Sequence, residues 1–140
     1  MKLFLDCEFN GFGGELISMA IVDENNHFFY EVLEIQNINT WVSLNVMPVL
    51  NKLPISKEYF KNKLQNYLTE YDSIEIIADW PDDFKYFFQS ITLDNGYKLK
   101  TPKIIAVLDE SLNAKSSTVP HNALHDAIAI KNMYMENVCH

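Results

Sequence analysis

The most informative absence from this sequence of 140 residues is arginine. All eleven basic residues are lysines, and the formal net charge is −8 at pH 7. Arginine supplies the bidentate contacts with which proteins read phosphates and guanine bases, and nucleic-acid readers are generally basic. The composition therefore argues against a sequence-reading nucleic-acid binder. If the substrate is nevertheless a polyanion, bound divalent cations would have to supply much of the attraction.

Cysteines and long apolar runs are also scarce. Cys7 and Cys139 lie near opposite ends of the chain and have no metal-binding spacing. No apolar run reaches the roughly 20 residues that cross a bilayer, and acidic residues arrive too early for a signal peptide. We therefore expect a reduced, cytoplasmic protein without a membrane partner.

The hydrophobic pattern predicts one α/β domain over residues 1–140, with a mixed five-stranded sheet flanked by helices. The expected strands, of which the first three form an antiparallel meander, cover residues 2–5, 15–22, 27–32, 73–78 and 103–108. The expected helices begin at Thr40 and Ser56 and then cover residues 84–91 and about 123–138. Pro48 should bend or break the first of them.

Acidic residues collect where the predicted strands end and the predicted helices begin. Asp6 and Glu8 end the first strand, and they point the same way because strand side chains alternate between faces. Asp126 lies in the first turn of the last helix. The turn after the fourth strand holds three more acids, Asp79, Asp82 and Asp83. Such positions are where α/β domains build their sites.

Converging carboxylates repel one another unless cations neutralise them. Two Mg²⁺ or Mn²⁺ ions would do so, because hard cations prefer oxygen ligands. Two such metal ions about 3.5–4 Å apart suit phosphoryl transfer. His121, five residues before Asp126, is a candidate general base. Each residue also has a structural interpretation, such as helix capping or a favourable charge at a helix N-terminus. The features together, in this order, favour a catalytic site.

Two motifs resemble those of DEDD-type 3′–5′ exonucleases with a catalytic histidine, a family of the ribonuclease-H-like superfamily. Asp6-Cys7-Glu8-Phe9-Asn10-Gly11-Phe12 matches Asp-x-Glu-x-x-Gly-(Leu/Phe), and His121-Asn-Ala-Leu-His-Asp126 matches His-x-x-x-x-Asp. The N-terminal half and the short length are similar to the compact bacterial and phage exoribonuclease group of mycobacterial RNase AS. The resemblance implies a ribonuclease-H-like fold and a homodimer.

The resemblance also implies roles for single residues. Two Mg²⁺ or Mn²⁺ ions would be bound by four carboxylates, those of Asp6, Glu8, Asp83 and Asp126. His121, rather than His125, would deprotonate the attacking water. Asp83 fits the helix-start position of the middle motif best, and Asp79 and Asp82 stay open as alternatives.

The loop from Asn10 to Gly14 holds three of the four glycines, so its backbone can approach a ligand closely. By resemblance, main chain around Phe9, Asn10 and Gly11 would meet the 3′ nucleotide, and Phe12 would pack against its base. A core position is the alternative for Phe12. The expected substrate is single-stranded RNA at its 3′ end, with release of nucleoside 5′-monophosphates. DNA or short oligonucleotides are alternative substrates, and a non-catalytic nucleic-acid-binding module is the alternative function.

Overall fold

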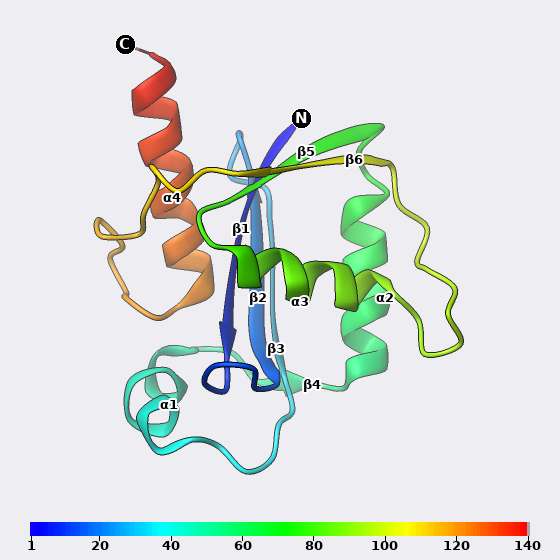
Figure 1. Ribbon diagram of the computed structural model, residues 1–140, viewed down its shortest axis with the longest axis vertical. Helices are drawn as coiled ribbons and strands as arrows, with labels where there is room; N and C mark the ends of the chain where they lie inside the picture. The colour runs from blue at the N-terminus through cyan, green and yellow to red at the C-terminus, as the bar shows by residue number, and fades with distance from the viewer. Residues whose placement is uncertain (140) are drawn as a thin grey trace.

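A mixed sheet with the strand order β4-β3-β2-β1-β5-β6 organises the computed structural model of this protein, which describes residues 1–139 (Figure 1). The six strands are β1 (Lys2–Phe9), β2 (Leu16–Asp23), β3 (Phe28–Leu33), β4 (Pro54–Ile55), β5 (Ser73–Ala78) and β6 (Lys103–Leu108). The helices are α1 (Thr40–Asn45), the 3₁₀ helix η1 (Met47–Val49), α2 (Lys57–Leu68), α3 (Pro81–Ile91) and α4 (Ala123–Val138).

The sheet confirms the predicted α/β class and the antiparallel meander of β1, β2 and β3. β5 and β6 run parallel to β1, as strands separated by helices usually do. The prediction of five strands was wrong, because β4 pairs with the end of β3 as a sixth. β4 has only two residues and begins with a proline, so it leaves no alternating pattern in the sequence.

Two boundary predictions were also wrong. β1 extends to Phe9, so Asp6 and Glu8 lie inside the strand and not after its last residue. α3 begins at Pro81, three residues before the predicted start, so Asp83 lies within its first turn. Proline fits the first position of a helix, where its missing N–H needs no partner, and acids in the first turn are favoured by the helix dipole.

Both faces of the sheet are covered, and each cover forms its own hydrophobic core. On one face Leu3 and Leu5 pack with α2 and α3, and on the other Phe4 packs with α1 and α4. The side chains of Leu3, Phe4 and Leu5 are completely buried. Burying such a side chain stabilises a fold by about 1.5–3 kcal/mol, so packing on both faces of the sheet stabilises the position of β1. The even positions Asp6 and Glu8 therefore face the side of the sheet that carries α4.

Several caps define the helices around this core. Asn39 accepts hydrogen bonds from the N–H groups of Trp41 and Val42 at the start of α1, and Ser56 caps α2. Pro48 falls in η1, where the predicted break in the first helix occurs. Within residues 1–139 we find no helix that is both long and apolar enough to cross a membrane.

A tight loop, Asn10 to Gly14, connects β1 to β2. Two backbone hydrogen bonds close this loop. The N–H of Asn10 donates to the carbonyl oxygen of Glu15 at 2.8 Å, and the N–H of Gly14 donates to the carbonyl oxygen of Gly11 at 3.0 Å. A Cβ atom at Gly14 would lie 2.0 Å from the carbonyl oxygen of Asn10. Only glycine can therefore close this loop without moving its backbone.

We expect Gly14→Ala to shift the loop and to destabilise the protein by about 1–3 kcal/mol, the usual cost of forcing atoms into filled space. Gly13→Ala is the matched control, because a Cβ at Gly13 meets nothing within 4 Å and only its positive φ opposes the change. Thermal unfolding of both variants gives the comparison. A Gly14→Ala protein that melts with the wild type would contradict the described loop.

Candidate metal centre

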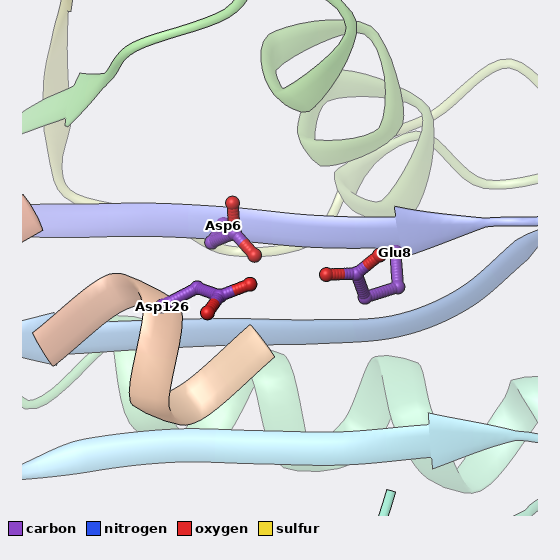
Figure 2. Close-up of side chains that lie close together, drawn as sticks. All are labelled: Asp6, Glu8 and Asp126. Carbon is purple, nitrogen blue, oxygen red and sulfur yellow. The ribbon is translucent and has the colours of Figure 1, made fainter. Parts of the chain in front are cut away.

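Three carboxylates meet on the face of the sheet that carries α4. Asp6 and Glu8 project from β1, and Asp126 projects toward them from the first turn of α4 (Figure 2). One oxygen from each lies within 4.8 Å of the others. The period of two along β1 explains the first pair, and the start of α4 supplies the third residue.

The N-terminus of α4 is held in place by its cap. Asn122 accepts a hydrogen bond from the N–H of His125 at 3.1 Å and donates through its side chain to the carbonyl oxygen of Val49 at 2.9 Å. Asn122 is 3% exposed, so these bonds are shielded from water. The cap therefore ties α4 to η1 and sets where Asp126 lies relative to β1.

A second group of carboxylates lies on the other side of Asp6. It joins Asp6 to Asp79, which follows β5, and to Asp83, with one oxygen of each again within 4.8 Å of the others. The buried side chain of Asp83 accepts a hydrogen bond from the N–H of Cys7 at 3.1 Å. β1 and β5 are parallel neighbours, so their carboxyl ends lie at the same edge of the sheet.

Asp6 is thus common to both groups. The structure brings two of the three candidates for the middle acid, Asp79 and Asp83, to Asp6, and it places Asp82 in neither group. Sharing one carboxylate between two sets of oxygen ligands is the arrangement that a pair of neighbouring cations requires. The donor set, which consists of carboxylates, suits hard ions such as Mg²⁺ or Mn²⁺.

Two oxygens of this centre lack partners. The Oδ2 atom of Asp6 and the Oδ1 atom of Asp126 are buried, and neither has a hydrogen-bond partner among the described residues. A buried polar atom without a partner costs about 1–3 kcal/mol, and more when it carries charge. Cations bound between the two groups would give both oxygens a partner, so the residues present fit such ions.

The carboxyl groups also disturb each other's titration. Burial, followed by the charges of Asp83 and Glu8, raises the pKa of Asp6 well above its usual range. Burial and the neighbouring Asp126 raise the pKa of Glu8 to about 9, and burial with the charge of Asp79 raises the pKa of Asp83 to about 8. Without cations, the centre therefore holds protons at neutral pH.

His121 lies beside this centre, just before the cap of α4. It is exposed and has a left-handed backbone, with φ of 69°. Its imidazole contacts the indole of Trp41 edge-on, with ring centroids 5.2 Å apart. Burial raises the pKa of Asp126, and the nearby His121 opposes that shift. The imidazole of His125 contacts Thr118, with its Nδ1 atom 3.0 Å from the hydroxyl of that residue.

The contact of Trp41 with His121 was not predicted from the sequence. Trp41 is 53% exposed, and Leu44 on the same helix is 72% exposed. Trp41 and Leu44 are three residues apart and share the exposed face of α1, whereas Val42 is the residue that this helix buries. The indole of Trp41 instead packs beside the imidazole of His121.

The glycine loop presents one aromatic side chain to solvent. Phe12 is 96% exposed, so the alternative of a core position was wrong. Phe9 stacks on Tyr86 with centroids 4.9 Å apart, which leaves mainly its backbone available to a ligand. Asn10 accepts a hydrogen bond from the N–H of Asn39 at 2.7 Å, so the loop is tied to the start of α1.

Comparison with known proteins adds no further identification. No protein-family model matches this chain, and a search of curated proteins finds no match to it. The resemblance to DEDD-type exonucleases therefore rests on the two motifs and stays a prediction. Any function of the protein has to be consistent with the positions of the two carboxylate groups and of His121.

We expect the metal-free protein to lose stability as the pH rises from about 6 to about 9. In that range the folded state keeps protons on Glu8 and Asp83 that the unfolded chain has already released, so raising the pH favours unfolding. Mg²⁺ or Mn²⁺ should raise the melting temperature more at about pH 8 than at about pH 6, because binding displaces those protons. A metal-free melting temperature that is constant or rises over this range would contradict the description of the centre.

We expect Asp6→Ala to stabilise the metal-free protein by about 1–3 kcal/mol, since it removes an unpaired buried oxygen and relieves repulsion. The same variant should lose the rise in melting temperature that the ions produce. Asp72→Ala, which removes an exposed acid just before β5, should change neither property. A metal-free Asp6→Ala protein that melts well below the wild type would argue against a strained cluster.

Proposed function

We propose that this protein is a metal-dependent 3′–5′ exoribonuclease that releases nucleoside 5′-monophosphates, and that its sheet and helices form a ribonuclease-H-like fold. The observation that carries the proposal is the position of Asp6 in two groups of carboxylates, with His121 at the edge of one of them. The unpaired oxygens of Asp6 and Asp126 support the metal requirement. The two sequence motifs support the reaction type.

Two bound divalent ions would activate a water molecule and stabilise the oxygen that leaves phosphorus. Asp6 would contact both ions, with Glu8 and Asp126 completing one set of ligands and Asp79 or Asp83 the other. His121 would take the proton from the attacking water, which its exposed position allows. The water oxygen becomes part of the released 5′-monophosphate, and the shortened chain keeps its 3′ oxygen as a hydroxyl.

The exposed ring of Phe12 offers a stacking surface for the terminal base, which would be sequence-tolerant because every base has a π face. The choice of RNA over DNA rests on the resemblance to exoribonucleases alone. The homodimer implied by that resemblance also stays a prediction, and sedimentation of the purified chain measures it.

His121→Ala should lower the rate of 5′-labelled RNA shortening by about 10²–10⁴-fold, the usual contribution of a positioned general base. His125→Ala is the matched control, since its ring lies against Thr118. The assay compares RNA with DNA in Mg²⁺, in Mn²⁺ and in EDTA.

Shortening by single nucleotides from the 3′ end, abolished by EDTA, is the result that the proposal expects. Faster shortening of DNA than of RNA would change the substrate and keep the mechanism. Unchanged RNA and DNA in the presence of either metal would favour the alternative of a non-catalytic nucleic-acid-binding module. An unaffected rate in His121→Ala would remove this histidine from the mechanism.

A further inference from the structure

A cavity of about 410 Å³ lies between the glycine loop, α2 and α3. Its walls include Gly13 and Gly14 from the loop, the ends of β3 and β2, and side chains from the two helices. The aromatic rings of Phe60 and Tyr86 form part of the lining. This space is distinct from the carboxylate centre, none of whose acids lines it.

Three lysines converge on this cavity. Lys57 and Lys61 are one turn apart on α2, and Lys85 comes from α3. The protein has only eleven lysines and a net charge of −8, so three in one cavity form a local concentration of positive charge. Burial, followed by the charge of Lys57, lowers the pKa of Lys61.

None of these lysines is closely paired with a carboxylate. The ammonium of Lys57 lies 3.7 Å from a carboxylate oxygen of Asp94, and both side chains are mostly exposed. Lys61 donates to the backbone carbonyl of Thr92, and Lys85 lies over the ring of Tyr86. The lining also contains two exposed acids, Glu15 and Glu34.

Other lysines of the protein are neutralised more closely. Lys52 and Lys63 both contact Glu31, at 2.9 and 3.1 Å, and Glu31 is buried. Surface ion pairs like that of Lys57 contribute little to stability and are easily exchanged for another anion. The cavity lysines therefore have charge to offer to a ligand.

The cavity and the carboxylate centre share one helix, α3. α3 contributes Asp83 to the centre and, within about 9 Å along its axis, Lys85 and Gln89 to the cavity. The hydroxyl of Tyr86 donates to the carbonyl of Gly14, which fixes α3 against the loop. Asp6 and Glu8 face the α4 side of the sheet and the cavity lies on the side that carries α2 and α3, so a chain that occupies both has to cross the glycine loop after β1.

We infer that this cavity is a second phosphate subsite, which binds the backbone of single-stranded nucleic acid upstream of the linkage that is cleaved. The inference rests on the proposed function and extends it to the length of the substrate. Lysines bind phosphate as point charges and read no bases, so the subsite adds affinity without sequence preference. A dinucleotide ends before the cavity and gains nothing from it, whereas a longer chain does.

Equilibrium binding of a 5′-labelled single-stranded RNA oligonucleotide tests the subsite directly. The measurement uses Mg²⁺ and the His121→Ala background, so that the chain is not shortened, and varies the salt concentration. Replacing Lys57, Lys61 and Lys85 together by glutamine should reduce the slope of log affinity against log salt by about 2, or about 0.7 for each lost contact. Lys100→Gln, which removes an exposed lysine that does not line the cavity, should leave the slope unchanged.

Steady-state kinetics with His121 intact give an independent result. The triple variant should raise KM for a long RNA on the order of tenfold, keep its kcat, and cleave a dinucleotide as the wild type does. An unchanged salt slope together with an unchanged KM overturns the inference and leaves the exonuclease proposal standing. A reduced slope in a protein that shortens no RNA supports the subsite and overturns the exonuclease.

Discussion

The crowding of carboxylates around Asp6 is the constraint on which the rest of this structure depends. Asp6 lies on β1, near the middle of the sheet. A carboxylate oxygen of Asp6 lies within 4.8 Å of oxygens of Glu8 and Asp126, and one lies within 4.8 Å of oxygens of Asp79 and Asp83. In the absence of cations, burial raises the pKa of every member of these two groups, and the charges of neighbouring carboxylates add to this shift in all of them except Asp126. A strand that carries such a group has to be held by other interactions, and Leu3, Phe4 and Leu5 supply them from both cores.

The parts that were predictable from the sequence are those with a clear period. Alternation along β1 correctly put Asp6 and Glu8 on one face, and the helical pattern correctly bounded α4 at residues 123–138. The short strand β4 left no pattern to read, because it consists of only two residues that pair with β3. Pro81 was available as a start signal for α3, and reading it would have corrected that boundary.

The candidate site was predictable in its membership and not in its geometry. The sequence left Asp79, Asp82 and Asp83 open, and only the turn between β5 and α3 shows that two of them reach Asp6. The exposure of Phe12 depends on how the glycine loop closes, and the contact of Trp41 with His121 depends on where α1 packs. Contacts between residues far apart in the chain have no periodic signal, so only the structure reveals them.

We propose that Asp6 joins two cation sites. Diffraction data from crystals grown with Mn²⁺, collected where manganese scatters anomalously, test it most directly. We predict two anomalous peaks about 3.5–4 Å apart, one beside Glu8 and Asp126 and one beside Asp79 or Asp83, with Asp6 touching both. The second peak would also decide between Asp79 and Asp83. Crystals that contain manganese elsewhere and show no peak beside Asp6 would contradict the account.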